Sequence, residues 1–191
     1  MSNDHPAILP VNADQSDADL RWFALRVRPR HEKSASQFLE TLGYELFCPT
    51  FTRKHTYGTR VRVFQLPLFA GYVFCRFDVT HRLPVLKAPG VVSIVGLGRT
   101  PIPIQEDEIN SLRMVVSTEL PVEPHPFVDV GESVEITAGP LSGIVGTVIR
   151  VKDAWRIVLS ITLLRRSVLV EVDPSKLVPA EPSVRSNLHA A

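Results

Sequence analysis

The sequence predicts two domains, an α+β sandwich followed by a small all-β barrel. Patterns typical of strands and of helices alternate up to residue 120, whereas from residue 129 the apolar residues recur with a period of two and no helical pattern follows. Between these regions, residues 121–126 contain three prolines, which predict a stiff, extended linker. We therefore expect a disordered tail at 1–19, the first domain at 20–120, the linker at 121–128, the barrel at 129–180 and a second disordered tail at 181–191.

The composition indicates an ordered protein without a membrane segment. A hydrophobic content of 45% excludes a chain that is disordered throughout. No apolar run approaches the roughly 20 residues that cross a bilayer, and the N-terminus is acidic and polar rather than a signal sequence, so we expect a cytoplasmic protein. Cys48 and Cys75 are the only cysteines, and neither lies at metal-ligand spacing with histidines. We expect buried thiols and no metal site.

The charge is unevenly distributed, although its sum is only +1. Two groups of basic residues fall in the first domain, namely Arg26, Arg28, Arg30, His31 and Lys33, and then Arg53, Lys54, His55, Arg60 and Arg62. Acidic residues predominate from Glu106 to Glu135. One part of the first domain should therefore be basic, whereas the connection to the second domain should not.

The first domain opens with a strand and a helix. Residues 22–27 have the pattern of a strand, which Pro29 ends. Helical spacing of apolar residues predicts a helix from His31 to Leu42, which Gly43 terminates. A second strand at 44–54, an exposed turn at 57–60 and a third strand at 61–66 are expected to follow.

A further strand is expected after Pro67, which interrupts the ladder. From Phe69 to Phe77 large apolar residues recur with a period of two around Gly71. Both faces of this strand would carry bulky side chains, so one face can fill a core and the other needs a partner. The domain is completed by a strand at 91–95, a loop at 96–98 and a helix at 105–120 with Ile109, Leu112 and Val116 on one face.

Four β-rich segments follow the linker. Their apolar residues are Val134 and Ile136, then Ile144, Val145 and Val148, then Ile157, Leu159 and Ile161, and finally Val168, Val170 and Val172. Turns are expected at 139–143 and 152–155. Short strands without a helix over about 55 residues are most economically a small barrel.

Two motifs resemble those of a known family. The run Pro67–Phe77, preceded by the aromatic strand Trp22–Val27 and the helix that starts at His31, is similar to the N-terminal domain of NusG-type transcription factors. Val134–Val148 resembles a KOW motif, the opening hairpin of an SH3-like barrel. The resemblance implies a NusG N-terminal-type α/β sandwich followed by a KOW barrel.

The resemblance also implies a polymerase contact on the first domain. NusG-type factors grip the clamp helices of the largest subunit of RNA polymerase with a shallow apolar pocket, and the matching residues here are Trp22, Phe69, Ala70, Gly71 and Tyr72. Ala70 stands where the family has a proline. The alternative is that the aromatic residues simply form the core. Alternation opposes this, because it sends Tyr72 and Phe74 to the face opposite Phe69, so they cannot all point inward.

The first basic group has two interpretations. It is either a solvated strand end without a ligand or a contact with the phosphates of upstream or non-template DNA, made by Arg26, Arg28, Arg30 and Lys33. Specialised relatives that resemble RfaH use a basic residue matching Arg28 for such contacts. Each neutralised phosphate would release a counterion, so the affinity would fall with salt.

In the second domain the resemblance implies a partner site on one loop of the barrel. Family members bind ribosomal protein S10 or the termination factor Rho there, and the corresponding residues are Leu163, Leu164, Arg165 and Arg166. Leu164 keeps the apolar character of the family's aromatic residue, whereas Arg165 replaces a glycine of the housekeeping members. This replacement argues against a Rho contact more strongly than it argues against the barrel fold.

The sequence contains no nucleophile elbow, glycine-rich phosphate loop or metal spacing, so we expect no catalytic residues and no cofactor. We predict a monomeric transcription elongation and antitermination factor that suppresses pausing or termination. The altered loop and the start of the Phe69 strand favour a specialised RfaH-like or UpxY-like paralogue. The alternatives are the housekeeping NusG and, from a different class, a ribosome-associated KOW RNA-binding protein.

Overall fold

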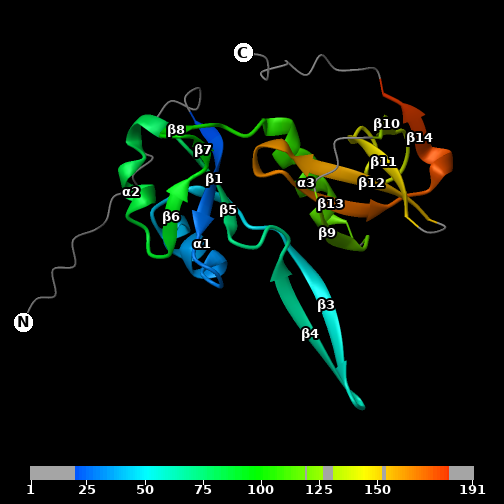
Figure 1. Ribbon diagram of the computed structural model, residues 1–191, viewed down its shortest axis with the longest axis horizontal. Coiled ribbons are helices and arrows are strands. Elements are labelled where there is room, and N and C mark those ends of the chain that lie inside the picture. Colours follow the sequence, from blue (N-terminus) through cyan, green and yellow to red (C-terminus); the bar gives the residue numbers. More distant parts are fainter. Residues whose placement is uncertain (1–19, 119, 127–130, 152–153, 181–191) are drawn as a thin grey trace, which may run out of the picture. The chain divides into compact units, whose positions relative to one another are not determined.

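The computed structural model describes residues 20–118, 120–126, 131–151 and 154–180 (Figure 1). The chain divides into two compact units, Met1–Glu106 and Asp107–Ala191. The first contains helices and strands, and the second is rich in strands, so the predicted α+β class is confirmed. The tails predicted at 1–19 and 181–191 lie outside the described residues.

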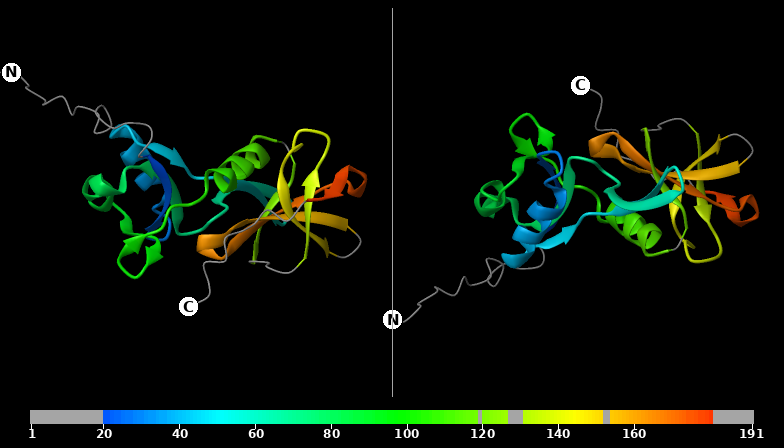
Figure 2. Two further views of the ribbon diagram at one scale, coloured as in Figure 1. Left: turned by 90° about the horizontal axis from the view of Figure 1, so that it is seen from above. Right: turned by 90° about the horizontal axis from the view of Figure 1, so that it is seen from below.

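The first unit is built on a four-stranded antiparallel sheet in the order β2-β5-β1-β6. The strands of this unit are coloured from blue to green in Figure 2. The central strands, β1 (Arg21–Val27) and β5 (Tyr72–Phe77), pair from Arg21↔Phe77 to Arg26↔Tyr72. The outer strands are β2 (Glu45–Phe47) and β6 (Val91–Ile94). Helix α1 (Glu32–Thr41) confirms the helix that the spacing of its apolar residues predicts.

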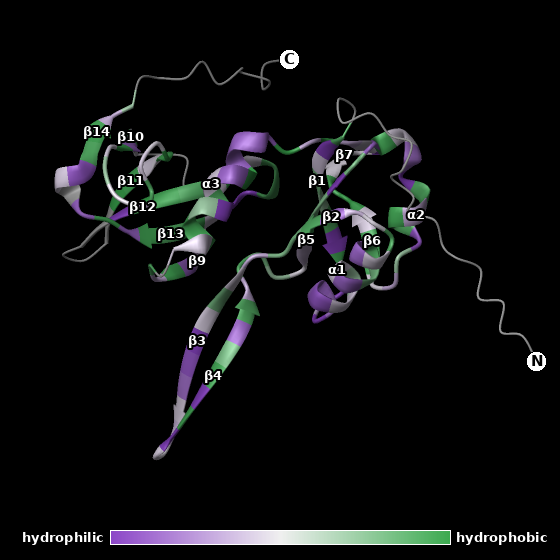
Figure 3. Cartoon of the chain, turned by 180° about the vertical axis from the view of Figure 1, so that it is seen from behind, coloured by the Kyte–Doolittle hydropathy of each residue, from purple (hydrophilic) through white to green (hydrophobic). Residues whose placement is uncertain are grey.

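The strand expected at 44–54 is two strands. After β2, the chain passes through Cys48 and Pro49 and then enters β3 (Thr50–Tyr57). Pro49 has no N–H to donate, which ends the first ladder. Strand β3 pairs only with β4 (Arg60–Pro67), and the two form a separate two-stranded ribbon, seen in Figure 3. The predicted turn at 57–60 is confirmed, with Gly58 at a φ of 59°.

The strand expected to begin at Phe69 begins at Tyr72 instead. Residues 68–71 form a turn in which the Tyr72 N–H donates to the Phe69 carbonyl at 3.0 Å. Gly71 has a φ of 84°, in the left-handed region that breaks a strand. The period of two therefore cannot be extended from Tyr72 back to Phe69.

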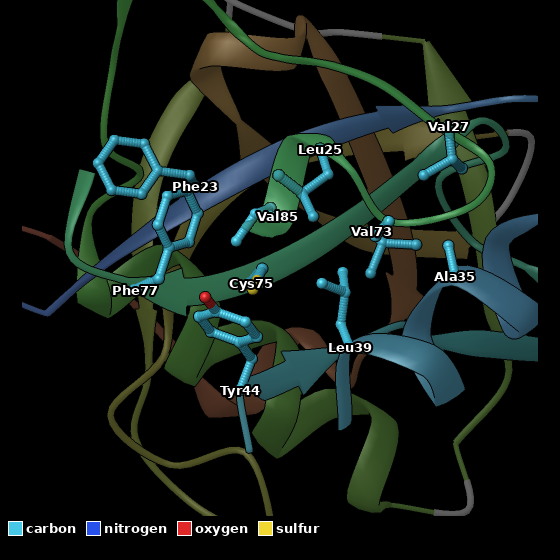
Figure 4. Close-up of a cluster of buried hydrophobic side chains, with 11 residues drawn as sticks. Phe23, Leu25, Val27, Ala35, Leu39, Tyr44, Val73, Cys75, Phe77 and Val85 are labelled. Atoms are coloured by element: carbon cyan, nitrogen blue, oxygen red, sulfur yellow. The ribbon is translucent and has the colours of Figure 1, made fainter. Parts of the chain in front are cut away.

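A core fills the space between α1 and the sheet (Figure 4). Alternate residues of β1 and β5 enter it, and the cluster comprises Phe23, Leu25, Val27, Ala35, Leu39, Tyr44, Val73, Cys75, Phe77, Val85 and Ala88. The rings of Phe23 and Phe77 lie 4.9 Å apart. Alternation in β1 and β5 predicts that these residues share one face of the sheet.

Short elements complete the first unit. They are a 3-10 turn at Val79–His81, α2 (Leu83–Leu86), β7 (Gly96–Leu97) and β8 (Thr100–Pro101). Pro84 lies in the first turn of α2, where its missing N–H costs no helical hydrogen bond. The loop predicted at 96–98 is a small hairpin of β7 and β8.

The second unit contains a six-stranded antiparallel sheet in the order β14-β10-β11-β12-β13-β9. Its strands are β9 (Val122–Pro126), β10 (Glu132–Ile136), β11 (Val145–Val151), β12 (Ala154–Ile161), β13 (Arg166–Glu171) and β14 (Leu177–Pro179). Ile157, Val168 and Val170, which the period of two predicts to face the core, are buried. Val158 and Leu169, which lie between the predicted core positions, are buried as well.

The segment predicted as a linker is largely a strand of this sheet. Strand β9 pairs with β13 from Val122↔Val170 to Pro126↔Arg166. It lies at the end of the sheet order, where prolines are tolerated because a terminal strand needs donors on one side only. Sequence alone cannot distinguish this edge strand from an extended linker, since both favour proline and lack helical spacing.

Helix α3 (Glu106–Ser117) confirms the helix predicted at 105–120 and buries Ile109, Leu112 and Val115. We assigned it to the first domain from the sequence, whereas the division at Glu106 groups it with the second unit. Its Glu108 carboxylate accepts a hydrogen bond from the Thr162 hydroxyl at 2.9 Å. Thr162 opens a 3-10 turn (Thr162–Leu164) between β12 and β13.

Candidate functional site

The turn at 68–72 is fixed on three sides by hydrogen bonds. The Gly71 N–H donates to the Glu32 carboxylate at 2.8 Å, and the Gly71 carbonyl accepts from the Val27 N–H at 2.9 Å. The Leu68 N–H donates to the Pro49 carbonyl at 2.8 Å. The turn is thus tied to α1, β1 and the entry to β3.

Glu32 has an unusual position for a carboxylate. It lies in the first turn of α1 and is 7% exposed. The helix dipole favours a negative charge at this end of a helix, and the Gly71 N–H provides a hydrogen-bond donor for it. Sequence analysis missed the contact because the two residues are 39 positions apart and nothing local marks the pair.

An aromatic layer lies on the face of the sheet opposite the α1 core. Paired residues of antiparallel strands share a face, so Phe47 of β2 and Ala24 of β1 both flank Phe74. The Phe47 ring stacks on Phe74 with centroids 6.0 Å apart, and the Phe69 ring meets Phe74 edge to face at 5.3 Å. The turn therefore places Phe69 on this layer.

The five residues predicted to bind polymerase fall into two groups. Trp22 and Phe69 are each 1% exposed. Gly71 and Tyr72 are half-buried, and Ala70 is exposed. The argument that the aromatic residues cannot all point inward was wrong, because Phe69, Phe74 and Trp22 are all buried. It assumed a continuous strand, which the turn at Gly71 interrupts.

The basic residues predicted to contact DNA are all exposed, namely Arg26, Arg28, Arg30 and Lys33. Arg26 pairs with Tyr72 in the ladder, so the two share the face that carries the aromatic layer. Arg30 has a φ of 67°, in the left-handed region, where the chain turns from β1 into α1. Within the described residues, none of the four forms an ion pair.

The loop predicted to bind a second partner lies between β12 and β13. Leu163 and Leu164 are half-buried, whereas Arg165 and Arg166 are exposed. Arg165 has a φ of 47°, a left-handed conformation that glycine adopts more readily. The Arg165 N–H donates to the Thr162 carbonyl at 3.1 Å, which closes the 3-10 turn.

A polar cluster follows β5. The Asp78 carboxylate accepts from the Thr80 N–H at 2.8 Å and from the Thr80 hydroxyl at 2.6 Å, and the His81 Nδ1 lies 2.8 Å away. The Thr80 hydroxyl hydrogen bond, followed by the backbone and His81 hydrogen bonds, lowers the pKa of Asp78 to about 2. The cluster caps the Val79–His81 turn, a structural role.

The described residues offer no site for a metal ion. No group of three histidines, cysteines or carboxylates with suitable placement occurs among them. Cys75 is buried and Cys48 is half-buried, and burial raises the pKa of both thiols. No helix in the described part of the chain is long and apolar enough to cross a membrane.

The chain is similar to proteins of one family. Residues 20–113 match the family model described as "Transcription termination factor nusG". A relative from Thermus thermophilus, "Transcription termination/antitermination protein NusG", is 28% identical over 64% of this chain and 73% of its own. The protein of the same name from Campylobacter jejuni is 25% identical over 80% and 93%.

Among solved structures, "Domain interaction in Thermotoga maritima NusG" is 19% identical and covers 86% of this chain and 99% of its own, with a TM-score of 0.49.

Proposed function

Because this chain is a NusG-type factor whose family domain spans residues 20–113, we propose that it controls transcription termination or antitermination by binding RNA polymerase through its first unit. Two curated relatives that are named for this function match 64% and 80% of the chain. The partner surface on the polymerase is the pair of clamp helices of its largest subunit.

The observation that carries this proposal is the tethered turn at 68–72. Its hydrogen bonds to Glu32, Val27 and Pro49 hold the backbone in one conformation. A surface that is already in its binding conformation loses little conformational entropy when a partner docks. Ala70 and the exposed part of Tyr72 then contact the clamp helices, and Arg26 lies beside Tyr72 on the same face.

The burial of Trp22 and Phe69 changes the role that we propose for them. At 1% exposure neither ring offers area to a rigid partner. Phe69 packs edge to face on Phe74 and supports the turn from beneath. Phe69 therefore acts as a positioning residue for Ala70 and Tyr72, and neither Phe69 nor Trp22 is itself a contact.

The remaining parts of the function follow from the other two sites. The exposed cations Arg26, Arg28, Arg30 and Lys33 contact the phosphates of upstream or non-template DNA. The loop at 163–166 recruits a second partner, ribosomal protein S10 or Rho. Bound to RNA polymerase, to DNA and to this second partner, the factor suppresses pausing or termination. It does so as a specialised paralogue that acts on particular operons.

The proposal is tested by a pull-down of the full chain with core RNA polymerase. Tyr72→Asp and Ala70→Glu should abolish binding, since each places a charge on the docking surface. Ala70 is exposed, so its substitution leaves the fold intact, which circular dichroism checks. Leu164→Asp, in the loop of the second unit, should bind as the unaltered protein does. Normal binding by both surface variants contradicts the proposal.

Two further comparisons separate the alternatives. Transcripts measured after deletion should change in a few operons, whereas broad changes or lethality would identify the housekeeping factor. Sedimentation with ribosomes, in the absence of binding to polymerase, would favour the ribosome-associated RNA-binding protein.

A further inference from the structure

The β3–β4 ribbon exposes both of its faces. Its eight residue pairs run from Thr50↔Pro67 to Tyr57↔Arg60, and neither strand pairs with another described strand. Apart from the residues next to its base, the side chains of both strands are exposed. Such a ribbon buries almost no apolar area within itself. Packing inside the ribbon therefore does not explain why it carries aromatic and basic side chains.

The two faces of the ribbon differ in chemistry. Paired residues share a face, and successive residues alternate between faces. One face, which we call the arginine face, carries Arg53, His55, Tyr57, Arg60, Arg62 and Phe64. The other face, the threonine face, carries Thr52, Lys54, Thr56, Val61, Val63 and Gln65. Thr52 and Gln65 share a hydrogen bond of 2.9 Å there, consistent with this division.

The arginine face carries uncompensated positive charge. No aspartate or glutamate occurs between Glu45 and Asp78 in the sequence. Within the described residues, Arg53, Arg60 and Arg62 form no ion pairs. Three guanidinium groups on one face and the absence of acids nearby match an anionic ligand, and guanidinium forks suit phosphate oxygens in particular.

Aromatic rings lie between these arginines. The rings of His55 and Tyr57 stack on each other with centroids 4.4 Å apart and planes at 21°. Tyr57 is 57% exposed, so the outer face of this ring pair is open to solvent. Rings that are already stacked and exposed provide a platform for a planar base.

We propose that the arginine face binds single-stranded DNA, with phosphates on Arg53, Arg60 and Arg62 and a base on the His55–Tyr57 platform. This goes beyond the proposed function, since the ribbon is separate from both the tethered turn and the basic group at Arg26. A single strand is favoured over a duplex because only unpaired bases offer their faces for stacking. The arginines alone do not distinguish DNA from RNA, because a ribose 2′-hydroxyl can accept their hydrogen bonds. DNA is named because the proposed function already has this unit contact upstream or non-template DNA, and on this point the inference rests on that function.

Fluorescence anisotropy of the full chain with a labelled single strand of about 15 nucleotides tests this proposal. At about 0.1 M salt, Arg62→Ser should weaken binding by about fivefold and reduce the salt slope by about 0.7, as expected for one lost phosphate contact. Lys54→Ser is the matched control, because it removes one charge from the neighbouring position on the threonine face. It should change the affinity by less than about twofold.

A second pair of variants tests the platform. Tyr57→Ala should weaken binding about tenfold without changing the salt slope, since it removes stacking and no charge. Val61→Ala, opposite Thr56 on the threonine face, should have no effect. All four positions are exposed strand residues, and circular dichroism should show an unchanged fold.

Several results would overturn the proposal. Equal losses of affinity for Arg62→Ser and Lys54→Ser would indicate nonspecific charge attraction to the ribbon rather than binding on its arginine face. An unchanged affinity for Tyr57→Ala would exclude stacking of a base on the His55–Tyr57 platform. Tighter binding of duplex DNA or of RNA of the same sequence would assign another ligand, and displacement by polyglutamate at equal charge would indicate an acidic protein surface. No polymerase is present, so a failure here is distinct from a failure of the polymerase pull-down.

Discussion

The carboxylate of Glu32, at the start of α1, accepts a hydrogen bond of 2.8 Å from the backbone N–H of Gly71. This contact joins a helix on one face of the sheet to the turn that enters β5. Since Ala70 and Tyr72 flank Gly71, the position of the proposed polymerase contact depends on a residue that does not itself lie on that surface.

Glu32→Ala should loosen the turn. The substitution leaves the Gly71 N–H without its acceptor, which costs about 1–3 kcal/mol in the free energy of unfolding. Amide hydrogen exchange at Gly71 should accelerate more than at β1 and β5, and polymerase binding should weaken. Glu32→Gln keeps an acceptor oxygen and should lose less. Glu40→Ala, an exposed residue of the same helix, is the control and should leave exchange at Gly71 unchanged.

Gly71→Ala should destabilise the first unit through its backbone alone. A Cβ at this position would meet only the Val27 carbonyl oxygen, at an ordinary distance of 3.9 Å. The φ of 84° nevertheless disfavours an L-residue by about 1–2 kcal/mol. Gly71→Asn should cost less, because asparagine tolerates the left-handed region. Urea unfolding measures both losses, and equal losses would contradict a conformational origin.

Arg165→Gly should be neutral or stabilising by up to about 1 kcal/mol. Glycine relieves the left-handed conformation at a φ of 47°, and its greater entropy in the unfolded chain offsets part of the gain. Arg166→Gly is the matched control. Arg166 lies in β13 opposite Ile161, where glycine should instead destabilise by about 0.5–1 kcal/mol. The opposite order of melting temperatures would contradict this interpretation of the loop.

The Asp78 carboxyl should titrate well below its ordinary pKa of 3.8. Hydrogen bonds from Thr80 and His81 favour its charged form and lower its pKa to about 2 in the folded protein. Because the folded value is depressed, the stabilisation is present above the ordinary value and is lost as the pH falls through about 2. Carbon NMR of the Asp78 carboxyl measures the midpoint, which Thr80→Ala should raise. A midpoint near 3.8 in the unaltered protein would show that these hydrogen bonds are absent in solution.

Local patterns predicted most elements of the fold. The spacing of Ala35 and Leu39 predicted α1, and recurring apolar residues predicted β1, β12 and β13. In β1 and β13 the residues of both faces are buried, so the sequence located these strands without identifying a single core face. The break at Pro49 was missed even though proline is a known strand breaker, since the flanking residues all have strand character.

The candidate site was harder to predict, because its geometry depends on contacts between distant residues. From the sequence, Phe69 to Tyr72 were predicted to lie together in one continuous strand. The structure shows a turn there instead, which is defined by the hydrogen bond from Gly71 to the Glu32 carboxylate and by the left-handed φ of Gly71. For the same reason the register of β3 with β4, which separates the arginine and threonine faces, was not predicted.

The prolines of β9 also affect how the molecule behaves at high concentration. Strand β9 is the last strand at one side of the sheet. When it pairs with β13, the backbone N–H and C=O positions of alternate residues, Pro124 and Pro126 among them, point away from β13 toward the open edge. Neither has an N–H, so a strand from another molecule that approached this edge would find two of its carbonyl groups without a donor. The open margin of the sheet is thereby protected against intermolecular strand addition and aggregation.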